Sequence, residues 1–438
     1  MDVPGPPTRM QRASISAAPP QPRSFFGTHV VRAAFVLAIF GWGVGFYGPP
    51  IFLHAVVERT GWPLVTVSSA VTLHFLFGAA VVVNLPRAYR RFGVPATIVA
   101  GACVAAAGIV GWATAATPLQ LFVAALASGG GWVALGAVAI NAVIARWYER
   151  SRPTALAKAY NGASIGGVVF SPLWVALIAS AGFVTATALV GTATVVVAAA
   201  LAWLVFSKTP EQLGQLPDGD VPGVSPAAVE PADARPSPGR TLLRNRRFLT
   251  LAAAMAIGLF VQVGLIAHLF NLLAPAIGAQ RAGVAMALAT ACAIGGRAIV
   301  ARALGAGADR RLAACAAYLV QMIGALVLAG AGGHNVGFIL LGVLLFGSGI
   351  GNATSLPPLI AQVEFARQDV PRVIALIVAI AQAAYAFAPA AFGVLLALSS
   401  GNDARFGRGT GVFFLAAAIL QCAAIAGLLA GRSRRVRR

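Results

Sequence analysis

Long apolar stretches separated by short polar turns run along almost the whole chain, which is the pattern of a helical membrane protein. A helix of about 20 apolar residues crosses the hydrocarbon core of a bilayer. Spanning segments are either helices or barrel strands, and these stretches are too long and too uniformly apolar for strands. The pattern predicts an all-α membrane protein with twelve transmembrane helices in two pseudo-symmetric six-helix bundles. The predicted spans are residues 31–56, 64–85, 95–116, 119–145, 155–180, 183–206, 248–276, 282–304, 312–331, 336–362, 373–398 and 410–430.

Polar segments divide the chain into five predicted parts. The first segment is rich in Pro, Ser and Arg and lacks the apolar core of a signal peptide, and the central segment is too polar to fold alone. We therefore expect a disordered cytoplasmic tail, an N-terminal bundle, a cytoplasmic linker, a C-terminal bundle and a basic cytoplasmic tail. These parts are residues 1–30, 31–206, 207–247, 248–430 and 431–438.

The two predicted bundles resemble each other as internal repeats. The segment 130–172 can be laid on 347–389 without a gap, which matches Phe170 with Phe387 and Pro172 with Pro389. Many transporters are built from such repeats, with the binding site between them.

The charge of the chain indicates its topology. The net charge is +20, and most of the 32 Lys and Arg residues fall in the tails, the central linker and the turns after spans 2, 4, 8 and 10. Basic residues concentrate on the cytoplasmic side of membrane proteins. We therefore expect both termini in the cytoplasm, a multi-pass protein of the cell membrane with the lipid bilayer as its partner, and no nucleic-acid partner.

The inventory of reactive side chains argues against an enzyme. None of the twelve Asp and Glu residues falls in the middle of a span, and the four cysteines show no metal-binding spacing. No nucleophile–base pair or metal cluster is visible in the sequence. We therefore expect no catalytic residues, no metal and no cofactor.

Arg297 is the one Lys or Arg that lies outside the loops, tails and helix ends. An arginine near the centre of a lipid-spanning helix costs roughly 2.5–3.5 kcal/mol on insertion scales, so the default interpretation is a functional site. The alternative without a function is an arginine whose side chain snorkels to the membrane–water interface. With no buried acid to pair with it, Arg297 predicts an anionic substrate.

Other polar residues within the spans are candidates for the same site. We expect Tyr47, Gln262, Asn352, Gln382 and Tyr385 to bind substrate, and Gln382 and Tyr385 share a helix face because they are three residues apart. His74 and His268 are candidates for proton coupling. The alternative for each histidine is a neutral, hydrogen-bonded residue of the core.

The turn Gly305-Ala306-Gly307-Ala308-Asp309-Arg310-Arg311 resembles the signature turn of the major facilitator superfamily. The resemblance implies a cytoplasmic gate at Gly305, Asp309 and Arg310, where the Asp caps a helix and pairs with basic residues. The equivalent turn of the first half departs from the pattern, with Pro86 in place of Gly and Arg90 in place of Asp.

Within the superfamily, the chain resembles the branch of monocarboxylate transporters and oxalate:formate antiporters. The similar segments are Gly43-Val44-Gly45-Phe46-Tyr47-Gly48-Pro49-Pro50 and Trp147-Tyr148-Glu149-Arg150-Ser151-Arg152. The resemblance implies alternating-access transport of a small organic anion, a monocarboxylate, with Arg297 or Arg302 as the arginine of the eighth helix. Monocarboxylate transporters carry an Asp four residues before that arginine, and here the position is Ala293. The departure argues against proton symport by that route.

Two other functions fit the same sequence. The thin polar lining also suits an exporter of hydrophobic or drug-like compounds, and a transporter-like sensor would bind its ligand without moving it. The short tails offer no signalling domain for a sensor. In each case we expect a monomer.

Overall fold

The computed structural model describes residues 25–220, 242–304, 308–333, 335–366, 369–400 and 410–432. Within these residues the chain is helical, and twelve helices or helix pairs are long and apolar enough to cross a membrane. The predicted number of spans is confirmed, and each span ends within a few residues of its predicted limits. The predicted gate residue Gly305 and most of both tails lie outside the described residues.

The N-terminal half contains six spans, and three of them change helical geometry partway. The first span breaks at Phe46 and Tyr47, the fourth passes through a 3-10 turn, and the sixth ends in a π-helix. In chain order the elements are α1 (Gly27–Gly45), α2 (Gly48–Thr60), α3 (Leu64–Val82), α4 (Leu85–Phe92), α5 (Val94–Thr114), α6 (Pro118–Trp132), η1 (Val133–Leu135), α7 (Ala137–Ala145), α8 (Arg152–Ala181), α9 (Phe183–Leu201) and η2 (Ala202–Phe206).

The C-terminal half repeats this plan after a connecting segment. The connection contains the short turns η3 (Glu211–Leu213) and η4 (Pro217–Gly219). The eleventh span breaks near Phe387, just before Pro389, because proline has no N–H to bond the carbonyl four residues earlier and its ring crowds the preceding turn. The helices are α11 (Arg246–Ile277), α12 (Ala279–Ala303), α13 (Arg310–Ala331), α14 (Val336–Glu364), α15 (Val370–Ala386), α16 (Ala388–Ser400) and α17 (Thr410–Ala430).

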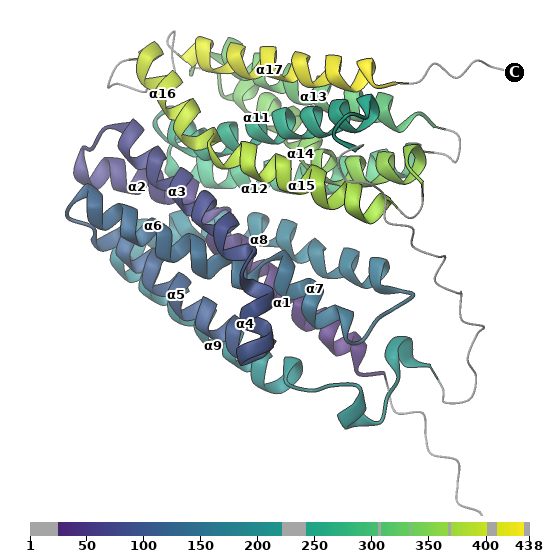
Figure 1. Ribbon diagram of the computed structural model, residues 1–438. Coiled ribbons are helices and arrows are strands. Elements are labelled where there is room, and N and C mark those ends of the chain that lie inside the picture. The colour runs from purple at the N-terminus through teal and green to yellow at the C-terminus, as the bar shows by residue number, and fades with distance from the viewer. Residues whose placement is uncertain are drawn as a thin grey trace, which may run out of the picture.

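Figure 1 shows the two halves side by side, with the first residues of α1 and α11 and the last residues of α17 at one end. We call this end, where α1 and α11 begin and α17 finishes, the terminal end, and the opposite end the far end. The halves meet mainly through α8 against α12, α3 against α16, and α2 against α11. Each half therefore presents helices to the other, which is the arrangement that places a site between repeats.

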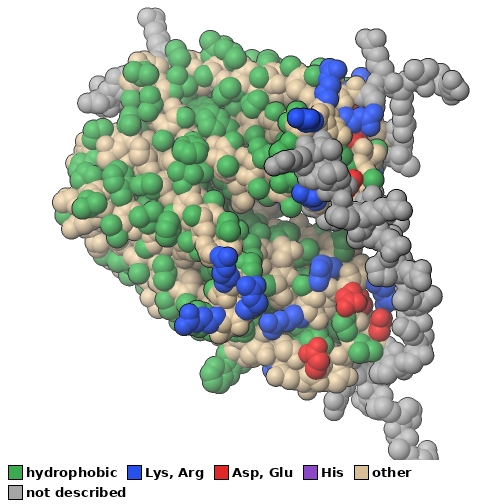
Figure 2. Space-filling model, viewed as in Figure 1, with side chains coloured by type: hydrophobic (Ala, Val, Ile, Leu, Met, Phe, Trp, Pro, Cys, Tyr) green, Lys and Arg blue, Asp and Glu red, His purple; other side chains and the backbone are tan. Residues whose placement is uncertain are grey.

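The outer surface suits a lipid environment. Large apolar side chains such as Val196 and Ile419 are more than half exposed in the interior of helices. Figure 2 shows apolar side chains over much of the visible face, with Lys and Arg gathered towards the terminal end. A surface of this kind is stable only when lipid covers it.

Glycines allow the helices within each half to approach closely. A Cβ at Gly296 of α12 would clash with the backbone carbonyl of Ser348 on α14, whereas a Cβ at the neighbouring Gly295 would meet nothing within 4 Å. Small residues at such contacts are the usual basis of packing between membrane helices.

This pair of adjacent glycines gives a matched test of the packing. We expect Gly296→Ala to destabilise the protein by about 1–3 kcal/mol because the clash is with backbone of α14, which cannot rotate away. Gly295→Ala should be neutral or stabilise by up to about 1 kcal/mol, since alanine loses less entropy in a helix. Thermal unfolding of both variants in detergent checks the difference, and equal melting temperatures would contradict the packing at Gly296.

Candidate functional site

Arg297 lies where the two halves meet, and its side chain crosses the interface. Its Nη2 donates a hydrogen bond to Ser164 Oγ on α8 of the other half. On the opposite side it lies against α14, where a Cβ at Gly351 would come within 2.6 Å of Arg297 Cγ. The guanidinium is half-buried, and no Asp or Glu of the described residues forms an ion pair with it. The charge is therefore held in place but not neutralised.

Tyr47 lies beside Arg297, in the break between α1 and α2. It lies beside Thr290 of α12, two turns before Arg297 on the same helix. Gly167 of α8 makes room for this pair, because a Cβ there would lie 2.5 Å from Tyr47 Cζ and 2.7 Å from Thr290 Cγ2. The break in the first span thus allows the Tyr47 ring to reach the second half.

A cluster of aromatic rings continues from Tyr47. The ring centroids of Phe46 and Tyr47 are 5.1 Å apart, and Phe46 lies 6.0 Å from Phe75 and 6.5 Å from Trp132. Phe75 in turn contacts Tyr385 of the other half at 6.0 Å. We call these five residues (Phe46, Tyr47, Phe75, Trp132 and Tyr385) the aromatic wall.

The aromatic wall ends in a polar pair on α15. Tyr385 shares a hydrogen bond with Gln382 of the same helix, and both residues are half-buried. The structure therefore places four of the predicted substrate-binding residues, Tyr47, Arg297, Gln382 and Tyr385, along one continuous path between the halves.

The space between the halves opens towards the terminal end. Contacts across the interface run from His54 with Asn271 near the far end, through Thr72 with Ala390, to Arg297 with Ser164. One turn nearer the terminal end, Asn161 of α8 is exposed although it lies within a span. Figure 2 shows the surface hollowed between the two halves on that side. Of these three contacts, the one between Arg297 and Ser164 therefore lies nearest the open, terminal end.

Two predicted substrate-binding residues lie elsewhere. Gln262 is buried on α11, and its Oε1 has no hydrogen-bond partner within the described residues. Asn352 is on the face of α14 directed away from Arg297, where it lines a groove of about 360 Å³ between α12 and α13. Its neighbour Gly351, not Asn352, faces the arginine.

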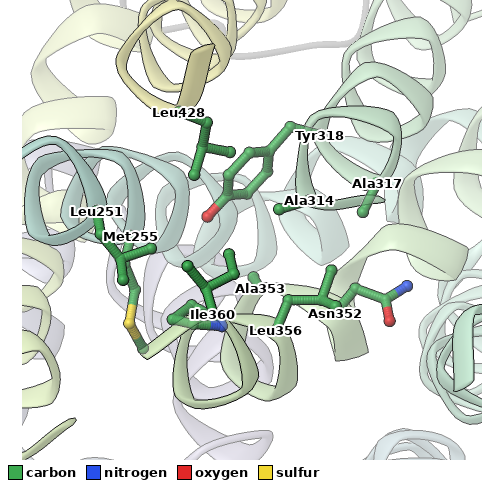
Figure 3. A pocket seen from close by; sticks show the side chains of 11 residues that line it. Leu251, Met255, Ala314, Ala317, Tyr318, Asn352, Ala353, Leu356, Ile360 and Leu428 are labelled. Atoms are coloured by element: carbon green, nitrogen blue, oxygen red, sulfur yellow. The ribbon is translucent and has the colours of Figure 1, made fainter. Parts of the chain in front are cut away.

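Asn352 also borders a small cavity inside the C-terminal half (Figure 3), between Tyr318, Leu356 and Leu428. Figure 3 shows the Asn352 amide directed away from the centre of this cavity. The cavity holds about 10 Å³, which is room for about one water. It is too small for an organic substrate.

His74 has the surroundings of a neutral core residue. It is 1% exposed, its Nε2 lies 2.8 Å from the carbonyl oxygen of Gly45, and its Nδ1 lies 2.9 Å from Ser128 Oγ. A carbonyl only accepts, so Nε2 carries the proton and Nδ1 accepts from the serine. The ring also stacks on Trp132, with centroids 5.5 Å apart. His74 therefore supports one residue of the aromatic wall from behind.

His268 differs because one of its ring nitrogens is unpaired. It is fully buried on α11, and its Nε2 donates to the carbonyl of Pro389, 2.8 Å away. Its Nδ1 is buried without a hydrogen-bond partner among the described residues. The ring lies near Gly393 of α16, which packs against Ser68 of the other half. His268 therefore lies behind the contact that closes the far end.

Ion pairs stabilise the terminal end of the C-terminal half. Asp309 accepts hydrogen bonds from the backbone of Arg311 and Leu312, so it caps α13, and its other oxygen lies 2.5 Å from Arg432 Nε. Arg311 is 2% exposed. Its Nε and Nη2 donate to the two carboxylate oxygens of Glu364 on α14, at 2.6 and 2.8 Å. These contacts join α13, α14 and the end of α17 within one half.

The first part of the predicted linker is attached to the N-terminal half. Asp218 accepts hydrogen bonds from the backbone amides of Glu149, Arg150 and Ser151 at the start of α8, and Asp220 lies 2.5 Å from Arg150 Nη2. Burial of the Asp218 carboxyl raises its pKa, but the hydrogen bonds from Ser151, Arg150 and Glu149 outweigh this and lower the pKa to about 2. The carboxylate therefore caps the three amides of the turn just before α8 at every physiological pH.

Removing the Asp218 charge should loosen this cap. We expect the amides of residues 149–151 to exchange about tenfold faster in Asp218→Asn, since an amide offers one acceptor oxygen in place of two. In the wild type this protection is fully present above about pH 4 and is lost as the pH falls through about 2, because the folded state has the lower pKa. Hydrogen exchange with mass spectrometry checks both, and unchanged exchange in the variant would contradict the cap.

The sequence did not single out several side chains of the site. Ser164, Thr290 and Phe75 contact Arg297, Tyr47 and Tyr385 from other helices, and isolated Ser, Thr and Phe residues are common in membrane spans. A signal was present at Trp132, because it ends the Gly-rich run of the fourth span just where the helix breaks.

Two six-helix halves with an arginine between them form an architecture that many membrane transporters use. A model of the Major Facilitator Superfamily matches residues 33–389, and the chain therefore belongs to this superfamily. It is a transporter and not an enzyme. A search of curated proteins finds no match.

Solved transporter structures share the fold. A bacterial homolog of the human lysosomal transporter Spinster, inward-facing and occupied, aligns over 93% of this chain and 97% of its own with 13% identity and a TM-score of 0.67. The unoccupied inward-facing form covers 94% and 98%, with 15% identity and a TM-score of 0.70. The nucleoside transporter NupG covers 93% and 100%, with 11% identity and a TM-score of 0.67. At these identities the likeness concerns the fold alone.

Proposed function

We propose that this transporter carries a small organic anion, in particular a monocarboxylate, by alternating access. The observation that carries the proposal is Arg297, a half-buried arginine between the halves that binds a serine and forms no ion pair with an acid of the described residues. Planar guanidinium groups bind carboxylates through two parallel hydrogen bonds. A bound carboxylate would supply the counter-charge that the protein leaves out.

The terminal end is the cytoplasmic side in this proposal, and the structure is then the inward-open state. Most Lys and Arg side chains lie at that end, as expected for a cytoplasmic face. Opening to the outside requires the contacts of His54 with Asn271 and of Thr72 with Ala390 to separate while the cytoplasmic ends close. Asp309 and Arg310 would belong to the cytoplasmic gate, and the segment after Phe206 would link the halves of one monomeric chain.

Transport by reconstituted protein tests the proposal. Proteoliposomes should take up a labelled monocarboxylate, and other monocarboxylates should compete, whereas the corresponding neutral amides should not. Competition by acids and amides alike would show that charge is not recognised and would overturn the proposal.

We also propose that proton coupling, where it occurs, uses His268 and not His74. Protonation of His74 would break its bond from Ser128, whereas the unpaired Nδ1 of His268 can take a proton without losing a partner. We expect His268→Gln to abolish accumulation driven by a pH gradient while exchange of substrate across the membrane continues. His74→Gln should instead lower the melting temperature, because it leaves buried groups unpaired at about 1–3 kcal/mol each. Gradient-driven accumulation that survives in His268→Gln would contradict the assignment.

A further inference from the structure

We infer that the substrate carries an aromatic ring beside its anionic group, so that the site takes aryl-substituted carboxylates in preference to short aliphatic ones. The inference rests on the proposed function and specifies the substrate class of the same site. It follows from the aromatic wall, which begins at the residue next to Arg297 and continues into the other half.

The rings of the aromatic wall begin beside the charge of Arg297. Tyr47 lies close to Arg297, and it contacts Phe46 in edge-to-face geometry, with an interplanar angle of 81°. A carboxylate on Arg297 therefore has an aromatic surface within one side chain of it. A short aliphatic acid would fill the polar end of the site and leave the rest of this surface uncovered.

The rings of the aromatic wall remain open to a ligand. Phe46, Tyr47, Trp132 and Tyr385 are each only partly buried, although all lie within spans. Tyr47 and Tyr385 make contacts across the interface between the halves. The aromatic wall therefore faces the interface there, and not the lipid. Partly exposed rings between two halves are a surface on which another planar apolar group can stack.

The aromatic wall is held in a fixed arrangement by its neighbours. His74, hydrogen-bonded at both nitrogens, stacks on Trp132 with an interplanar angle of 18°, and Phe75 packs edge-on to Trp132 and to Tyr385, at 74° and 84°. The aromatic wall ends at Tyr385, beside Gln382 on the same helix. Rigid rings around a single charged group favour a ligand whose body is flat and apolar.

The wall draws its members from both halves, which links binding to transport. Tyr385 belongs to the C-terminal half, whereas Phe46, Phe75 and Trp132 belong to the N-terminal half. A ring held between Tyr385 and Phe46 contacts both halves at once, so its binding energy can favour the state in which they close on it. A short acid reaches the two halves only around Arg297 and Ser164 and leaves Phe75 and Tyr385 without a contact.

A panel of matched ligands tests the inference on the purified full-length protein. We would measure the binding of 3-phenylpropanoate, propanoate and 3-phenylpropanamide by thermal shift and by competition for uptake. We expect 3-phenylpropanoate to bind about 100-fold more tightly than propanoate because the phenyl group buries apolar surface. Equal affinity of the two acids overturns this inference and leaves the anion transporter standing. Equal affinity of the acid and its amide overturns the proposed function, and no response from any member overturns both.

Two positions on one helix give the matched variants. Phe75→Leu removes a ring of the wall, whereas Phe77→Leu changes a ring of the same helix that is 41% exposed and packs on Gly130, away from the wall. We expect Phe75→Leu and Tyr385→Leu to reduce the preference for the aryl acid over propanoate about tenfold. Phe77→Leu should leave the preference intact. An unchanged preference in folded Tyr385→Leu would overturn the inference.

Discussion

Arg297→Gln is expected to lower uptake of the anionic substrate by about 30-fold or more. The substitution keeps a polar side chain, which ends two bonds short of the Nη2 that contacts Ser164, and removes the positive charge that the carboxylate needs. Removing one partner of a buried, hydrogen-bonded charge pair costs about 2–5 kcal/mol. Initial rates of uptake in proteoliposomes, at a substrate concentration below KM, measure the effect.

Two further variants separate recognition of the anion from a general effect of charge. Arg297→Lys should retain part of the activity, because an ammonium keeps the charge but cannot offer two parallel hydrogen bonds. Arg302 is exposed near the end of the same helix, so Arg302→Gln should transport nearly as well as the wild type. A large loss in Arg302→Gln together with normal uptake in Arg297→Gln would exchange the roles of the two arginines.

Glu364→Gln should have the largest effect on stability. Arg311 is almost fully buried, and besides Glu364 its guanidinium donates to Thr250 and to the carbonyls of Arg247 and Leu428. Without the carboxylate its charge is left buried and uncompensated, which costs about 3–5 kcal/mol. We expect a marked fall in the melting temperature in detergent, with less folded protein recovered from membranes.

The exposed ion pair at the same end supplies the control. Asp309 and Arg432 have side chains that are 33% and 41% exposed, and such pairs contribute about 0–1 kcal/mol. Asp309→Asn also preserves the cap on α13, since asparagine caps helices as well as aspartate does. Its melting temperature should stay close to that of the wild type. A loss as large as that of Glu364→Gln would mean that the buried pair has no special role.

The fold could be predicted from the sequence because membrane spans are a local property. Hydropathy over about 20 residues identifies each helix, and basic turns indicate which ends lie together. The breaks in the first and eleventh spans were harder to foresee, although prolines stand just beyond both, at Pro49 and Pro389. Other prolines, such as Pro172, lie inside helices that continue.

Of the site, only those residues could be predicted that are unusual at their position in the sequence. A lone arginine in a span is conspicuous, and Gln382 and Tyr385 share a face by simple spacing. The partners of these residues come from helices more than a hundred positions away, as Ser164 does for Arg297. Which face a residue occupies also escaped prediction, because Asn352 and Gly351 are adjacent and point in different directions.

The central claim is that the guanidinium of Arg297 binds the carboxylate of the substrate. The most direct measurement is the affinity of one acid and its carboxamide, such as 3-phenylpropanoate and 3-phenylpropanamide, for the wild type and for Arg297→Gln by isothermal titration. We predict that the wild type prefers the acid by about 30-fold or more and that the variant shows no preference. The same preference for the acid in both proteins would contradict the claim.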